Sequence, residues 1–94
     1  MIVVVRSGPD TTDGRRGVTL ARIAGAPLVL IQNAVAFAHT GLAGSVGTGA
    51  TYALEDDLRL RGLGVKDIDE HIVRIGYPEL VDLLAGAEKV VGAF

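Results

Sequence analysis

The feature that most constrains this sequence is a pair of short apolar runs without alternating polar residues. Met-Ile-Val-Val-Val opens the chain, and Pro-Leu-Val-Leu-Ile follows at residues 27–31. A strand with one face in water alternates apolar and polar residues, whereas a strand covered on both faces is apolar throughout. The two runs therefore predict parallel strands that are buried between helices.

Strand-like and helical segments alternate along the remaining sequence. Strands are predicted at residues 1–5, 27–31, 50–54, 70–75 and 88–94, and helices at 10–24, 34–38, 55–61 and 78–85. Gly14 and Gly17 disfavour a regular start to the first helix, since each glycine costs up to ~1 kcal/mol there. Alternation with short connections predicts a three-layer α/β/α sandwich with a mostly parallel, about five-stranded sheet, like that of flavodoxin. Residues 1–94 are expected to form a single domain.

The composition restricts the classes of function. The chain has no cysteine, so it cannot carry a persulfide, a disulfide or a thiolate-bound metal itself. Its net charge of −2 and lack of a basic cluster argue against direct nucleic-acid binding. Glycine and proline interrupt the longest apolar run, which excludes a membrane span there, and no signal peptide is recognised at the start. We therefore expect a cytoplasmic protein.

Nearly half of the residues are apolar, which is a large share for a domain of this size. The hydrophobic fraction is 49% of 94 residues. A small domain has too little interior to bury so many apolar side chains. A partner subunit is therefore expected to cover part of the surface.

Three groups of residues could bind phosphate or a metal, but a structural role explains each of them better. The glycine-rich stretch at residues 41–49 lacks the lysine of a phosphate-binding loop and is expected to be a surface loop. Glu55, Asp56 and Asp57 are adjacent on a helix, so they diverge; they are expected to stabilise the helix start rather than hold a metal. His71 lies among acids at residues 67–70, where a solvated turn is expected. No metal site and no cofactor are predicted.

A ligand site, if present, is expected where the strands end. In open parallel sheets, sites form outside the carboxyl ends of the strands. The candidate ligand or interface residues there are Gln32, Asn33, His39, Glu55 and Tyr77. A catalytic alternative would need His39 and a carboxylate such as Glu55 within hydrogen-bond reach of each other, directly or through one water. No residue is assigned a catalytic role.

Three segments together resemble one protein family. They are Leu-Ile-Gln-Asn-Ala-Val at 30–35, Tyr-Ala-Leu-Glu-Asp-Asp-Leu at 52–58 with Arg-Gly-Leu at 61–63, and Ile-Gly-Tyr-Pro-Glu-Leu-Val at 75–81. In this order and spacing they resemble the DsrH/TusB family, the small subunits of sulfur-relay complexes. The similarity covers residues 28–94. The chain departs from the family pattern in having Asn33-Ala34 where Asp-Gly is usual, and in having no cysteine.

The resemblance implies a DsrE-like fold and a place beside DsrE/TusD-like and DsrF/TusC-like subunits. In such complexes a cysteine of the DsrE/TusD-type subunit carries the persulfide. The sulfur serves 2-thiolation of the tRNA wobble uridine or the oxidation of sulfur compounds. The leading hypothesis is therefore a non-catalytic subunit of such a complex. The alternative is a self-assembling homo-oligomer that binds a small ligand at the carboxyl ends of its strands.

Overall fold

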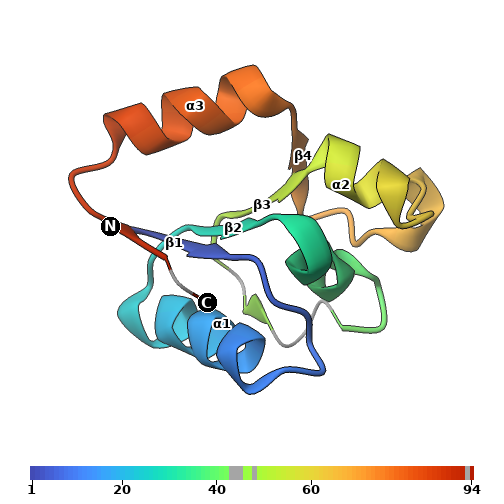
Figure 1. Ribbon diagram of the computed structural model, residues 1–94, viewed down its shortest axis with the longest axis horizontal. Helices are drawn as coiled ribbons and strands as arrows, with labels where there is room; N and C mark the ends of the chain where they lie inside the picture. Colours follow the sequence, from blue (N-terminus) through green and yellow to red (C-terminus); the bar gives the residue numbers. More distant parts are fainter. Residues whose placement is uncertain (43–45, 48, 93) are drawn as a thin grey trace.

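The computed structural model describes residues 1–42, 46–47, 49–92 and 94, and a five-stranded parallel sheet lies at its centre (Figure 1). The strands are Ile2–Val5 (β1), Leu28–Leu30 (β2), Thr51–Leu54 (β3), Val73–Ile75 (β4) and Val90–Val91 (β5). They lie in the order β4-β3-β2-β1-β5, and each neighbouring pair is parallel. The predicted α/β class with a parallel sheet of about five strands is confirmed.

The strand order reflects one change of direction. β2, β3 and β4 are added in turn on one side of β1, and the chain then returns to place β5 on the other side. Val3 accordingly pairs with Leu28, while Ile2 pairs with Val90. Flavodoxin has the order 2-1-3-4-5. The likeness to flavodoxin therefore lies in the layers and not in the order of the strands.

Helices flank the sheet on both faces. They are Thr12–Ala24 (α1), Gln32–Ala38 (η1, a 3-10 helix), Glu55–Leu60 (α2), Val65–Asp67 (η3, also 3-10) and Tyr77–Gly86 (α3). α1 and α3 lie on opposite sides of the sheet (Figure 1). η1 and α2 pack against each other, next to the strands that they follow.

α1 is regular from its first turn, so the predicted irregular start is wrong. Thr11 caps the helix, because its Oγ1 accepts a hydrogen bond of 3.0 Å from the Gly14 N–H. Both glycines are buried for a packing reason. A Cβ at Gly14 would lie 2.3 Å from the Gly8 carbonyl oxygen, and one at Gly17 would lie 2.5 Å from Cγ2 of Val5. The missing side chains allow the helix to lie close to β1 and to the loop after it.

Several bounds differ from the predicted ones. The strand predicted at 70–75 begins only at Val73, because the Ile72 N–H donates to the Asp69 carbonyl in a turn. The helix predicted at 34–38 begins two residues earlier, and that predicted at 78–85 gains one residue at each end. The last strand is described only at Val90–Val91. Residues 43–45 and 48 of the predicted glycine loop lie outside the described residues.

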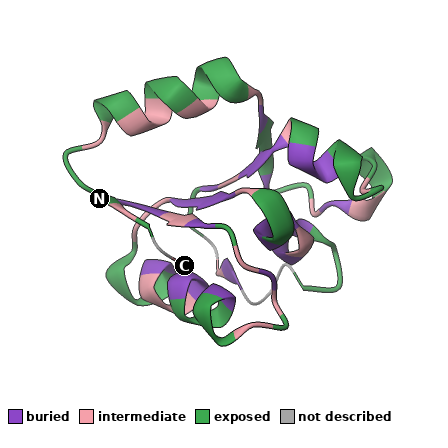
Figure 2. Ribbon diagram, in the orientation of Figure 1, coloured by how far each residue is buried: buried purple, intermediate pink, exposed green. Residues whose placement is uncertain are grey.

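The two faces of the sheet are covered to different extents. On the α1 side, a continuous core joins Val3, Val5, Leu28 and Leu30 to the helix through Val18 and Ala21. Because strand side chains alternate, the intervening residues point to the α3 side. α3 itself has no buried residue, whereas α1 has four (Figure 2). The α3 layer is therefore only loosely closed.

Candidate functional site

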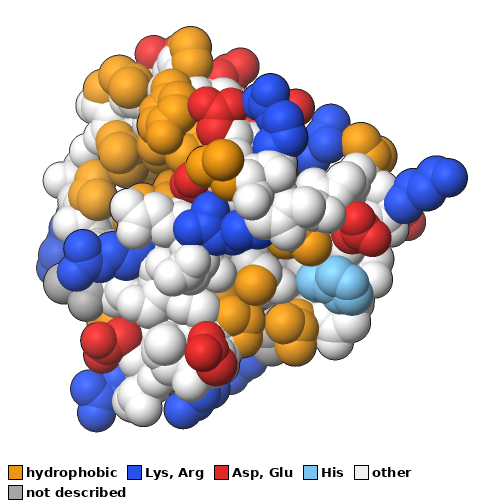
Figure 3. Space-filling model, turned by 45° about the vertical axis from the view of Figure 1, so that its right-hand side comes forward, with side chains coloured by type: hydrophobic (Ala, Val, Ile, Leu, Met, Phe, Trp, Pro, Cys, Tyr) orange, Lys and Arg blue, Asp and Glu red, His pale blue; other side chains and the backbone are white. Residues whose placement is uncertain are grey.

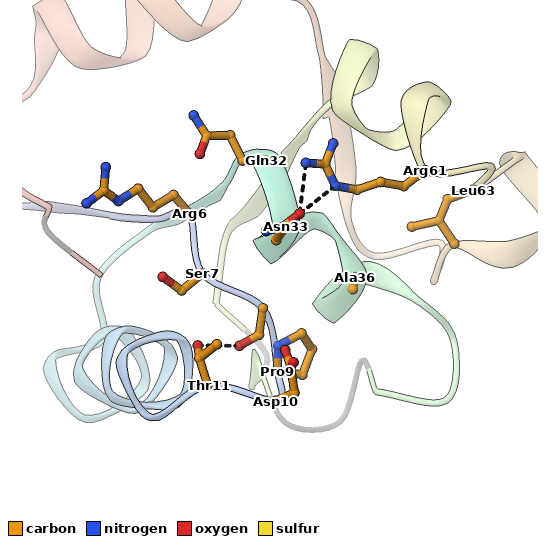
Figure 4. Close-up of a pocket in the computed structure, with 11 residues that line it drawn as sticks. Arg6, Ser7, Pro9, Asp10, Thr11, Gln32, Asn33, Ala36, Arg61 and Leu63 are labelled. Carbon is orange, nitrogen blue, oxygen red and sulfur yellow. Dashed lines mark hydrogen bonds between the residues drawn. The ribbon is translucent and has the colours of Figure 1, made fainter.

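A cavity of about 590 Å³ lies at the carboxyl ends of β1 and β2 (Figure 4). Three segments line it: the loop from β1 to α1, the start of η1, and the chain just after α2. The lining residues are Arg6, Ser7, Gly8, Pro9, Asp10, Thr11, Gln32, Asn33, Ala36, Arg61 and Leu63. The cavity thus lies where parallel α/β sheets form their ligand sites.

The loop from β1 to α1 is held in one turn by its own hydrogen bonds. The Thr11 hydroxyl and backbone N–H both donate to the Gly8 carbonyl, at 2.7 and 3.1 Å. The Arg15 guanidinium donates to the Pro9 carbonyl at 3.0 Å. Gly8 is buried against η1, since a Cβ there would lie 3.6 Å from the Asn33 carbonyl oxygen. These contacts fix the lower wall of the cavity.

The opposite wall begins at a strained residue. Gln32 is the one non-glycine among the described residues with positive φ, at 51°. Non-glycine side chains rarely adopt this left-handed conformation because Cβ crowds the neighbouring carbonyl. The Gln32 N–H donates to Oδ2 of Asp57 at 2.7 Å, and Asp57 is only 8% exposed. This hydrogen bond holds the sharp turn from β2 into η1.

Arg61 joins α2 to the same wall. Its Nε and one terminal nitrogen donate to Oδ1 of Asn33, at 3.2 and 2.9 Å, as Figure 4 shows. The other terminal nitrogen donates to the Asp57 carbonyl at 3.3 Å and lies 3.7 Å from that residue's carboxylate. The guanidinium is therefore held in a fixed orientation at the mouth of the cavity.

Positive charge exceeds negative charge in the lining. The lining contains two guanidinium groups, those of Arg6 and Arg61, and one carboxylate, that of Asp10. Arg6 is exposed and makes no ion pair within the described part of the chain. Leu63 and Ala36 give the right-hand side of the cavity in Figure 4 an apolar wall. The cavity thus offers cationic donors at one part and apolar surface at another.

The structure separates the residues that the sequence singled out as ligand candidates. Gln32 and Asn33 line the cavity, whereas His39, Glu55 and Tyr77 do not. His39 ends η1, and its Nδ1 accepts a hydrogen bond of 3.0 Å from the Gly41 N–H. Tyr77 opens α3 and is 54% exposed. The role of His39, Glu55 and Tyr77 at a ligand site or an interface stays a prediction.

His39 and Glu55 have separate direct contacts. Glu55 lies at the start of α2, with Oε1 3.8 Å from the Arg74 guanidinium. Nδ1 of His39 accepts a hydrogen bond within its own loop. Among the hydrogen bonds of the described residues, none joins His39 directly to Glu55.

The three acids at the start of α2 have three different partners. Glu55 faces Arg74, Asp56 forms an ion pair of 2.7 Å with Arg59, and Asp57 accepts from the Gln32 backbone. The sequence predicts helix-end stabilisation for all three. It misses the tertiary contact of Asp57, because the partner is 25 residues away along the chain.

The acids around His71 form local turn contacts. Oδ1 of Asp69 accepts from the His71 backbone N–H at 3.1 Å and contacts the His71 ring nitrogen Nδ1. The backbone hydrogen bond, and after it the ring contact, lower the pKa of the Asp69 carboxyl below its usual value. Asp67 instead accepts from the Gly64 N–H at 2.9 Å. In the described ranges no three acid or histidine side chains gather as a metal site would require.

The cavity residue with the most contacts that sequence reasoning did not select as a ligand candidate is Arg61. Its spacing of four from Asp57 indicates a contact on one helix face. Its contact with Asn33 crosses from the end of α2 to η1 and leaves no local pattern in the sequence.

No described helix is long and apolar enough to cross a membrane.

Comparison with known proteins gives one family and one fold. The profile of a family described as "DsrH like protein" matches residues 17–90. The crystal structure of the YchN protein from E. coli superposes with a TM-score of 0.84 over 97% of both chains, at 16% sequence identity. At that identity the likeness concerns the fold. No curated protein sequence matches the chain.

Proposed function

This chain belongs to the DsrH-like family, and on that basis we propose that it is a non-catalytic subunit of a cytoplasmic sulfur-relay complex. Its proposed partners are DsrE/TusD-like and DsrF/TusC-like subunits. In this role it would help to present a partner's persulfide for transfer. The sulfur would serve wobble-uridine 2-thiolation of tRNA or the oxidation of sulfur compounds.

The observation that supports assembly with another subunit is the incompletely covered α3 side of the sheet. α3 has ten residues and none of them is buried. Isolated helices shorter than ~12–15 residues are marginal in water. A helix of this length therefore needs packing contacts, which this chain supplies only in part. A neighbouring subunit that covers α3 would supply the remainder.

Exposed apolar side chains mark the surface that a partner would cover. Tyr77 and Val81 of α3 are 54% and 61% exposed, and Val73 at the edge strand β4 is 51% exposed. In Figure 3 hydrophobic side chains gather in the upper part of the view, at the height of α3. This apolar surface, formed by Val73, Tyr77 and Val81, fits a second folded subunit better than it fits solvent.

A groove on the same side of the sheet indicates the charge of the partner. A groove of about 370 Å³ lies between α3 and the sheet, lined by Tyr52, Ile75, Glu79, Asp82 and Leu83. Its walls are apolar, and its two charged residues are both acidic. A partner subunit with an apolar segment flanked by lysine or arginine would complement it.

The absence of cysteine defines the subunit's part in the chemistry. Sulfur transfer through a persulfide needs a thiolate nucleophile. The chain has no cysteine, so the sulfur would travel on a cysteine of a partner. The net charge of −2 likewise assigns any contact with tRNA to another component.

Co-purification from the native host tests the proposal. A tagged chain is expected to bring down a cysteine-bearing DsrE-like protein and a DsrF-like protein in fixed stoichiometry. Val81→Asp should abolish this recovery, because it places a charge in the apolar surface. Ile23→Asp is the matched control, since Ile23 is 78% exposed on α1 and on the other side of the sheet. Recovery of the chain without either partner, or equal recovery from both variants, would contradict the proposal.

The alternative is a homo-oligomer that buries the same surface. The exposed apolar side chains support it equally, because a second copy would also cover α3. Native mass spectrometry separates the two. A stable oligomer of the chain alone, unchanged when DsrE- and DsrF-like proteins are added, favours self-assembly.

A further inference from the structure

The cavity at the ends of β1 and β2 has the size of a small-molecule site. At about 590 Å³ it falls within the 300–1,000 Å³ range typical of ligand pockets. A lone inorganic ion would fill only a small part of it. An organic molecule is the better match.

Arg61 supplies a donor group that is already oriented. Of the five N–H donors of a guanidinium, those used by Asn33 and Asp57 leave one N–H on each terminal nitrogen. Two adjacent N–H groups in a fixed plane match two oxygens of a phosphate or sulfate group. Figure 4 shows the remaining terminal nitrogen on the side away from Asn33, so a bound oxyanion would approach from that free edge.

Arg6 and Ser7 can complete the coordination. Both line the cavity, and Arg6 has no ion pair within the described residues. Its exposed side chain points outward in Figure 4 and is free to turn toward a bound anion. The Ser7 hydroxyl makes no hydrogen bond to any other described residue; in Figure 4 it points away from Asn33 and Arg61, so its side chain would have to rotate to reach an anion held by Arg61. Asp10, the only acid in the lining, lies at the other end of the view from Arg61.

The strained start of η1 supports the arrangement. Gln32 at φ 51° is held by buried Asp57, and its neighbour Asn33 holds Arg61. Strained residues persist where the surrounding structure fixes them, and they cluster at ligand sites. Here the strain and the hydrogen bonds together fix the position of one guanidinium.

We propose that this cavity binds a small organic molecule through a tetrahedral oxyanion group, phosphate or sulfate. Arg61 and Arg6 hold the oxyanion, and the uncharged part of the molecule lies against Ala36 and Leu63. The site goes beyond the proposed role as a relay subunit and does not depend on it. Its test uses the isolated chain, so the assembly proposal stands or fails separately.

Binding is measured by following backbone amide NMR signals of the ¹⁵N-labelled chain. The probes are phenyl phosphate, phenyl sulfate, inorganic phosphate and phenol at constant ionic strength. Phenyl phosphate or phenyl sulfate should shift the signals of Ser7, Gly8 and Asn33, and the stronger of the two identifies the oxyanion. Inorganic phosphate should bind at least about tenfold more weakly, because it lacks the apolar part. Phenol should not bind measurably.

Three arginine variants make the result specific. Arg61→Gln should weaken binding of the aryl oxyanion by about tenfold or more, as expected for loss of a charged hydrogen bond. Arg6→Gln should weaken it by roughly threefold to tenfold. Arg59→Gln is the matched control, since Arg59 is exposed on the same helix and pairs with Asp56 instead. It should change the affinity less than about twofold.

Arg61→Gln also removes the contact with Asn33 and could prevent folding. In that case the affinity of the Arg6→Gln variant tests the proposal. Arg6→Gln breaks no hydrogen bond or ion pair of the described residues. Equal affinity of Arg6→Gln, Arg59→Gln and the unmodified chain would overturn the proposal. So would the absence of binding by both aryl oxyanions, or shifts confined to residues away from the cavity.

Discussion

At the residue scale, Asp57 has the most consequential contact described here. It is an acid in a helical turn, yet it is nearly buried and accepts from the backbone of Gln32 at 2.7 Å. Without it, a backbone N–H at a strained turn would lose its partner. An unsatisfied buried donor costs ~1–3 kcal/mol. Asp57 is therefore a structural residue of the cavity wall.

We expect Asp57→Ala to lower the free energy of unfolding by about 1–3 kcal/mol. The matched control is Asp56→Ala, because the exposed ion pair of Asp56 with Arg59 is worth only ~0.2–0.5 kcal/mol. Urea unfolding followed by circular dichroism measures both. Equal losses in the two variants would show that Asp57 acts only as a helix-end charge.

At the element scale, the position of α1 depends on the absence of a side chain. A Cβ at Gly17 would lie 2.5 Å from Val5 Cγ2 and 2.8 Å from the side chain of Phe94. The helix could not approach β1 so closely with any other residue there. Glycine is unfavourable in a helix interior, and here packing outweighs that cost.

Gly17→Ala should therefore destabilise the fold by about 1–3 kcal/mol, as overpacking does. Gly86→Ala in α3 is the control, because a Cβ there meets nothing within 4 Å. Its effect should lie between zero and a gain of about 1 kcal/mol. Thermal unfolding measures the difference, at roughly 4–8 °C per kcal/mol for a domain of this size. A Gly17→Ala melting temperature equal to or above that of Gly86→Ala would contradict this account.

Most elements could be predicted from the sequence because their signals are local. The apolar runs predict β1 and β2, and the helix predicted at 55–61 is found as α2 at Glu55–Leu60. Gly14 and Gly17 gave a wrong expectation because propensity describes an isolated helix. Their close contacts with β1 and its loop arise only in the folded chain.

The candidate site could be predicted only in part. The rule that sites lie at the carboxyl ends of strands correctly selects Gln32 and Asn33 as cavity residues. It also selects Tyr77, but Tyr77 follows the edge strand β4 and lies outside the cavity. Which strand ends share a cavity depends on strand order, and no local pattern encodes that order. The contact of Arg61 with Asn33 has the same origin.

At the scale of the whole molecule, the two helical layers differ in how firmly they are held. α1 has four buried residues and α3 has none. Local opening requires less free energy where few apolar contacts must be broken. The sheet is therefore well covered by α1 on one face and only partly covered by α3 on the other.

Hydrogen exchange should reveal this difference directly. In the isolated chain, amides of α3 should exchange roughly tenfold or more faster than those of α1. When a partner subunit covers α3, its exchange should slow to the range of α1. Mass spectrometry of the labelled chain, alone and in complex, measures both. Equal protection of the two helices in the isolated chain would show that α3 is stable without a partner.

The pairing of Ile2 with Val90 has a consequence for how the protein is made. On the ribosome, β1 can pair with β2 as soon as residues 28–30 have emerged. Its other edge stays open until β5 has been synthesised, and open edges of apolar strands invite pairing with other chains. The nascent chain therefore has an exposed β1 edge from the synthesis of β2 until that of β5, and this edge is where a chaperone that binds apolar strands is expected to act.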